Sequence, residues 1–128
     1  STISIYNNNV FYYPENNGLG SASAVKNNNE IILYNFDTNT FSKKFQSTFE
    51  ENKISTQSAG IIDFLNDGSA VIEETDNGKI YYINSNGEIN WEYVNLSSQK
   101  QLYDLWWLRV IDAEKSAKLR KILKKNDL

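Results

Sequence analysis

The stretch that decides the fold of this chain is NDGSAVIEETDNGKIYYINSNGEINWEYVN, residues 66–95. It holds three apolar segments, SAVIEE, KIYYIN and EINWEYV, separated by Asp76-Asn77-Gly78 and Asn86-Gly87. Asn-Gly between apolar runs is a strong hairpin signal, because the favoured short turns need positive φ angles. The stretch is therefore predicted to be a three-stranded antiparallel meander.

The second and third of these segments differ in how their apolar side chains are distributed. In the middle segment Ile80 and Tyr82 fall on one face, and Tyr81 and Ile83 fall on the other, so both faces are expected to be covered. The last segment carries its large side chains on a single face: Ile89, Trp91 and Tyr93. A small sheet with a doubly buried inner strand and a one-sided outer strand suits a stack of sheets, as in a β-propeller blade.

The same pattern occurs earlier in the chain. EIILYNFDTNTFSKKF (30–45) matches KIYYINSNGEINWEYV (79–94) with a one-residue shift at the turn, and GSASAVK (20–26) lies over GSAVIEE (68–74). The spacing is roughly 48 to 49 residues, within the ~40 to 50 typical of propeller blades. AGIIDFL (59–65) is predicted to be the innermost strand of the second unit, and TISIY (2–6) has a related place in the first.

Three further local features complete the predicted fold. The triplets 7–9 and 27–29, both Asn-Asn-Asn, indicate turns. FSKKFQSTF (41–49) reads as an outer strand with Phe41, Phe45 and Phe49 on one face. YDLWWLRVI (103–111) reads as a bulky strand, and DAEKSAKLRKILKK (112–125) as a helix with Asp112 as N-cap and lysines in its last turn.

The predicted fold class is all-β with a C-terminal α-helix. About two four-stranded antiparallel blade-like sheets, an incomplete β-propeller, occupy residues 1–95, with units at about 1–49 and 50–95. Residues 96–128 add a closing strand and an amphipathic helix to the same domain, and the apolar stripe of that helix is Leu119, Ile122 and Leu123.

Composition excludes several kinds of chemistry. Thirteen basic and sixteen acidic residues give a formal charge of −3, which is too balanced to argue for a nucleic acid or a membrane surface as partner. The chain has no cysteine and no histidine, so thiolate chemistry and the commonest catalytic base are absent. No phosphate loop, metal-ligand spacing or nucleophile triad is present, so no cofactor, metal site or catalytic residue is predicted.

Two groups of small polar residues are candidates for lining a substrate channel. The first group precedes the innermost strand of the second unit and consists of Ser55, Thr56, Gln57 and Ser58. The second group lies in the segment GSASAVK and consists of Ser21 and Ser23. Solvation and close strand packing are the alternative roles.

Four other residues are expected to have structural or solvent-exposed roles. Glu73 and Glu74 should face opposite ways, in solvent or near a cross-strand lysine, and at least one of Trp106 and Trp107 should lie in the core rather than stack on a sugar or base.

Residues 67–95, DGSAVIEETDNGKIYYINSNGEINWEYVN, resemble the closing blade of the bacterial arylsulfotransferase-type β-propellers. That blade carries the pattern G-N-T-L-I-x-E-G-x-x-G-R-I-x-E-V-x-x-x-G-E-I-V-W-E-Y. The matching positions are Gly68, Ile72, Glu74, Gly78, Ile80, Gly87, Glu88, Ile89, Trp91, Glu92 and Tyr93. TISIYNNN is similar to the family segment G-T-I-L-I-F-D-N-G, and GSASAVK lies where a Ser-Arg strand usually follows, although Ala22 replaces the arginine. The resemblance extends over roughly residues 2–95.

The resemblance implies an all-β propeller that transfers sulfuryl groups between phenols through a transiently sulfated histidine. That histidine is expected to precede Ser1, so this chain would supply channel wall and ring closure without the nucleophile, and whether it is enzymatic stays open. Expected partners are the remaining blades of a longer chain or further copies of this one, with a small aryl or sulfated ligand. A periplasmic or exported location is also implied. The alternative is a non-catalytic propeller-like binding or assembly module that presents its blades to protein or glycan.

Overall fold

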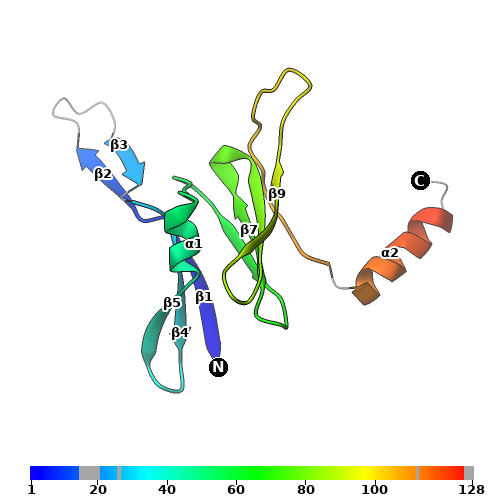
Figure 1. Ribbon diagram of the computed structural model, residues 1–128, viewed down its shortest axis with the longest axis horizontal. Helices are drawn as coiled ribbons and strands as arrows, with labels where there is room; N and C mark the ends of the chain where they lie inside the picture. The colour runs from blue at the N-terminus through cyan, green and yellow to red at the C-terminus, as the bar shows by residue number, and fades with distance from the viewer. Residues whose placement is uncertain (15–20, 26, 112, 126–128) are drawn as a thin grey trace.

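The computed structural model describes residues 1–14, 21–25, 27–111 and 113–125, with the backbone alone for 11–14 and 21–25. The strands are β1 (Thr2–Asn7), β2 (Val10–Pro14), β3 (Ser21–Val25), β4 (Glu30–Asn35), β5 (Thr40–Lys44), β6 (Ile61–Phe64), β7 (Ala70–Glu74), β8 (Lys79–Ile83) and β9 (Ile89–Val94). The helices are α1 (Gln46–Glu51), a 3-10 turn η1 (Thr75–Asn77) and α2 (Ala113–Lys125). The described part is mostly β, as predicted, with a C-terminal helix (Figure 1).

The second sheet is the predicted meander with one further strand, β6, at its edge. Its strand order is β6-β7-β8-β9, and every neighbouring pair is antiparallel. Gly78 ends η1 in the left-handed conformation, with φ of 58°, which explains the glycine between β7 and β8. At the next turn Asn84 Oδ1 accepts hydrogen bonds from the backbone N–H groups of Asn86 and Glu88, both at 3.0 Å.

The first sheet has three strands in the order β1-β4-β5, while β2 and β3 pair with each other. The expected second strand, GSASAVK, is therefore not part of this sheet. The reason is that β1–β2 and β3–β4 are the two arms of one long antiparallel hairpin. Because β1 pairs with β4 along its whole length, no position remains between them for another strand.

The two asparagine triplets lie opposite each other on the arms of this hairpin and do not reverse the chain, contrary to prediction. The pairing runs from Asn7↔Glu30 to Val10↔Val25, so two residues on one arm face four on the other. Asn9 and Asn27 have φ angles of 53° and 68°. The tolerance of asparagine for left-handed backbone thus accommodates an irregularity in the pairing rather than a turn.

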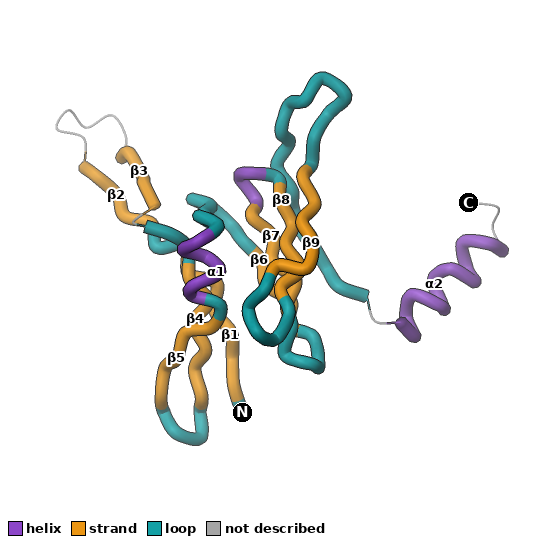
Figure 2. The backbone as a smooth tube through the Cα atoms, viewed as in Figure 1, coloured by secondary structure: helices purple, strands orange, loops and turns teal. Residues whose placement is uncertain are grey.

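The two sheets pack face to face, with α1 beside them, around one hydrophobic core (Figures 1 and 2). The buried members of that core come from β4, α1 and its flanks, β7 and β8: Ile31, Phe45, Phe49, Ile54, Ala70, Ile72, Tyr81 and Ile83. Tyr6 of β1 packs against this cluster, and its ring meets the Phe49 ring edge-on at 6.1 Å.

Corresponding residues of the two sequence repeats face opposite ways. Ile31 on β4 points into the core and is 1% exposed, whereas the aligned Ile80 on β8 belongs to the outer face of its sheet. Conversely, the aligned pair Ile32 and Tyr81 places Tyr81 in the core, at 3% exposed. The sheets therefore stack head to tail, in the same orientation, and the stack has two unlike outer faces.

Large apolar side chains remain exposed on both outer faces. The first sheet exposes Ile3, Ile5 and Phe41, and the second exposes Trp91 and Tyr93. Trp91 stacks on Tyr82 of the neighbouring strand with ring centroids 6.1 Å apart. Exposed apolar side chains gathered on one face of a sheet are typical of surfaces that contact another layer.

Two predicted strands are wrong. FSKKFQSTF is strand only to Lys44. Phe45 then adopts a φ of 58° and α1 begins, which turns Phe45 and Phe49 into the core and leaves Phe41 70% exposed. A spacing of four residues keeps side chains on one face of either a strand or a helix, so the pattern could not separate the two.

Residues 103–111 are not a strand, although they run across the second sheet. Its first part makes two backbone hydrogen bonds, from Tyr103 N–H to Asn95 and from Leu105 N–H to Thr75, and its later part is held by carboxylate side chains. The predicted C-terminal helix is confirmed as α2, which stands apart from the sheets (Figure 1) and has no buried residue. Neither α1 nor α2 has the length and apolar character that a membrane crossing requires, and this finding covers the described residues.

Candidate functional site

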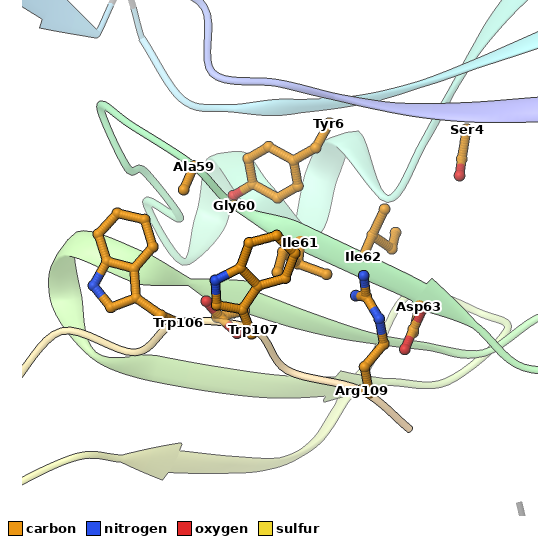
Figure 3. Close-up of a pocket in the computed structure, with 11 residues that line it drawn as sticks. Ser4, Tyr6, Ala59, Gly60, Ile61, Ile62, Asp63, Trp106, Trp107 and Arg109 are labelled. Atoms are coloured by element: carbon orange, nitrogen blue, oxygen red, sulfur yellow. The ribbon is translucent and has the colours of Figure 1, made fainter. Parts of the chain in front are cut away.

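A cavity lies where β1 and β6, which are edge strands of the two sheets, meet residues 103–111. Its volume is about 670 Å³. The lining residues are Ser4, Tyr6, Ala59, Gly60, Ile61, Ile62, Asp63, Glu73, Trp106, Trp107 and Arg109. Figure 3 shows Ser4 and Tyr6 extending from one side, and both indoles and Arg109 from the other.

The position of the Tyr6 ring depends on Gly60. An added Cβ at Gly60 would lie 2.5 Å from Tyr6 Cε1, and the residue has a φ of 119°. The ring can therefore lie flat against the backbone at the start of β6. Burial, and then the negative charges of Glu74, Asp76 and Glu73 together with the nearby Tyr81, raise the pKa of Tyr6 far above its ordinary value. Tyr6 is consequently a neutral phenol at any physiological pH.

Two carboxylates hold the far wall of this cavity in place. Glu73 Oε2 accepts the backbone N–H of Leu108 at 2.7 Å, and Asp63 Oδ2 accepts that of Val110 at 3.0 Å. Glu73 and Asp63 lie on one face of β7 and β6, so they capture alternate N–H groups of the segment that crosses them. This arrangement explains why 103–111 is ordered against the sheet without being a strand.

Both tryptophans of this segment are exposed, contrary to the expectation that one lies in the core. Trp106 is 60% exposed and Trp107 is 76% exposed, with Trp107 in left-handed backbone at φ 71°. Since Glu73 and Asp63 take up the backbone N–H groups of 108 and 110, the segment lies on the sheet through its main chain. The indoles are left to form part of the cavity wall.

The candidate channel residues 55–58 form a tightly braced loop before β6. Ser55 N–H donates to Glu74, at 2.7 Å, and the N–H groups of Gln57 and Ser58 both donate to Asp76 Oδ2. Thr56 is 1% exposed. None of the four is among the described lining residues of the large cavity, and their contact with a substrate stays a prediction.

Asp76 is the acceptor that organises this loop. Its partial burial raises the pKa of the carboxyl, but hydrogen bonds with Thr56, Ser58 and Gln57 outweigh that effect and leave the pKa below its ordinary value. Ser58 Oγ donates to the second oxygen, Oδ1, at 3.0 Å. The carboxylate thus stabilises the loop in its charged form.

Glu74 braces the same loop from the inside. It accepts hydrogen bonds from Ser55 N–H, Asn77 Nδ2 and Tyr81 Oη, the last at 3.0 Å. Burial, and then the charge and hydrogen bond of Glu74, raise the pKa of Tyr81. The prediction that Glu73 and Glu74 face opposite ways is confirmed, but the expectation of solvation is wrong, because they are 1% and 2% exposed.

Sequence reasoning missed one central residue, Asn29. It is 1% exposed, and its amide is saturated: Oδ1 accepts from Thr56 N–H and Tyr6 Oη, and Nδ2 donates to the carbonyls of Asn8 and Thr56. It therefore ties β1 and the start of β4 to the loop before β6. A signal was available, since Asn29 is in phase with the buried Ile31 two residues later.

The remaining candidates, Ser21 and Ser23, belong to β3, where they pair with Pro14 and Tyr12. Their side chains lie outside the described part of the chain. Across the described residues, no group of three or more histidine, cysteine or acidic side chains could hold a metal ion. The carboxylates near the cavity already accept backbone N–H groups, so the observed arrangement holds and positions chain segments.

Two antiparallel sheets stacked head to tail, with exposed apolar outer faces and a cavity at the edge strands, define a mostly-β repeat protein. The family model described as Arylsulfotransferase (ASST) matches residues 1–96, and the chain belongs to this family. No curated protein and no solved structure gives a significant match to it.

Proposed function

We propose that this chain forms two consecutive blades of an arylsulfotransferase-type β-propeller. In the complete protein, which transfers sulfuryl groups between phenols, the chain supplies channel wall and ring closure, and the catalytic histidine comes from outside it. The proposal rests on one observation above all, the head-to-tail stacking of the two sheets in a chain of this family.

Head-to-tail stacking favours a larger ring because each sheet can pack on the next through the same pair of faces. The outer face of the second sheet, with Ile80 and Tyr82, is the sequence equivalent of the first sheet's core face, with Ile31 and Leu33. The surface that packs against the second sheet in the first repeat thus occurs again in the second repeat, where residues 103–111 cross its β6–β7 part and the β8–β9 part stays exposed. Such heterologous contacts generate rings when the rotation closes, and the missing neighbours are either further blades of the same chain or further copies of it.

The cavity is consistent with a place on the channel wall. It lies at β1 and β6, which are the edge strands expected to be innermost in each unit. An exported or periplasmic location belongs to the same proposal and is supported by the family alone.

The test of assembly compares this chain with a variant that blocks its outer face. Light scattering should show the chain associating with itself, or with separately expressed upstream blades. Tyr82→Glu should abolish the association, because it places a charge on the outer face, whereas Lys53→Glu, on an exposed loop, should not. A wild-type monomer that unfolds in one fully cooperative thermal transition would refute the proposal.

The test of chemistry uses 4-nitrophenyl sulfate as donor and phenol as acceptor. The chain alone should give no transfer, because it lacks a histidine nucleophile. Turnover should appear only with the remaining blades present. Turnover by the pure chain would contradict the assignment of the nucleophile elsewhere, and a reading frame without a histidine upstream of Ser1 would favour the non-catalytic module.

A further inference from the structure

We propose that the cavity between β1, β6 and residues 103–111 binds a neutral saccharide. This goes beyond sulfuryl transfer, because the ligand class is argued from the walls of the cavity and not from the family. The walls combine exposed aromatic faces, a guanidinium and two carboxylates around a volume of about 670 Å³.

The aromatic wall suits the apolar face of a sugar ring. Trp106 and Trp107 present their rings to the cavity at 60% and 76% exposed, and Tyr6 lies across from them (Figure 3). A pyranose has a face of C–H groups that stacks on an indole, while its hydroxyls point outward from the ring edge. Large amphipathic rings at the rim of a hollow are a common form of binding platform.

The polar groups argue against a charged ligand. Arg109 disfavours a cation, and Asp63 and Glu73 disfavour an anion, so the wall carries both signs of charge within one hollow. A guanidinium has five N–H donors, of which one bonds the Leu108 carbonyl at 3.0 Å, and a carboxylate accepts more than the one bond that Val110 gives Asp63. A neutral ligand with many hydroxyls can use both kinds of group.

The wall is also held in position before any ligand arrives. Glu73 and Asp63 fix the backbone on both sides of Arg109, and Gly60 allows the Tyr6 ring to lie against β6. A site that needs little ordering on binding loses less affinity to conformational entropy.

Tryptophan fluorescence provides a direct test in the full chain. The chain has three tryptophans, so a Trp91→Phe background leaves Trp106 and Trp107 as the reporters. Titration with cellotetraose, maltotetraose and chitotetraose should give a saturable change with at least one of them. No saturable change with any of the three, or saturation only with 4-nitrobenzoate or tetramethylammonium, would overturn the proposal.

Two variants then locate the site. In the Trp91→Phe background, Trp107→Ala and Arg109→Gln should each weaken binding by about tenfold or more, which corresponds to about 1.4 kcal/mol. Both side chains are exposed, and Arg109→Gln keeps hydrogen-bonding capacity without charge, so it remains informative should Trp107→Ala fail to fold. Binding that neither substitution changes would place the sugar elsewhere and overturn the assignment.

Discussion

The two sheets come from one repeated sequence pattern, yet their aligned residues have opposite environments. Ile31 and Ile80 correspond in sequence, and only Ile31 is enclosed by the other sheet. The corresponding asparagines, Asn35 and Asn84, do the same job in both sheets, since each accepts backbone N–H groups from the turn that follows it. Local structure is therefore set by the repeat, whereas burial is set by the place of each copy in the stack.

The second strand of the repeat is where the copies differ most. The second copy has Glu73-Glu74 at its end, and the aligned first-copy residues are Val25-Lys26. The two carboxylates of β7 hold the loop 55–58 and the segment 103–111. In the first copy the corresponding strand, β3, pairs with β2 instead. The carboxylates of Glu73 and Glu74 therefore occur in the copy where two chain segments have backbone N–H groups for them to accept.

The largest expected effect tests the difference in burial. Ile31→Ala should lower the free energy of unfolding by about 2–5 kcal/mol, because it removes a fully enclosed side chain from between the sheets. Ile80→Ala should cost clearly less in this chain, since Ile80 is only partly buried. Urea unfolding of both variants measures the difference. Equal losses would show that the outer face is already covered.

A smaller effect is expected at the carboxylates. Glu74→Ala leaves the buried hydroxyl of Tyr81 without its acceptor, and an unsatisfied buried group costs about 1–3 kcal/mol. The control is Glu92→Ala, which removes an exposed ion pair with Lys79 and should cost about 0–1 kcal/mol. Glu74→Gln should recover part of the loss in urea unfolding. If Glu74→Ala and Glu92→Ala behave alike, Glu74 does not brace the loop.

Much of the fold could be predicted because hairpins carry local signals. The meander, the inner strand β6, the β4–β5 pair and α2 all follow from turn residues and periodicity. The pairing of β3 with β2 instead of β4 could not be predicted. It depends on β1 taking the place beside β4, and that contact leaves no local signal in the sequence. The end of β5 was missed since the Phe41, Phe45 and Phe49 spacing fits strand and helix equally.

The site was less predictable than the fold. The loop 55–58 was recognised as polar, but its hydrogen bonds to Glu74 and Asp76 join residues about twenty positions apart. Glu73 and Glu74 looked solvated because acidic residues are seldom buried. The burial of Glu73 depends on the distant segment 103–111, which supplies an N–H donor without forming a strand, and that of Glu74 depends on the loop 55–58 and on Tyr81. Such contacts leave no periodic trace in the sequence.

The smallest predicted effect is an acid dependence that belongs to the second copy alone. The pKa of Asp76 is held below its ordinary 3.8 in the folded chain, so its contribution to stability is fully present above that value. The contribution is lost as the pH falls from there through the lower folded pKa, because the protonated acid is a poorer acceptor for the loop 55–58. Thermal midpoints of the wild type and Asp76→Asn, measured from pH 7 down to the acid limit, should differ at neutral pH and begin to converge only below about pH 4. Other carboxylates titrate in both proteins and cancel in the difference. A difference that stays constant across the range would mean that the Asp76 side chain acts through shape and not through charge, and that the charged acceptor bracing the loop is Glu74.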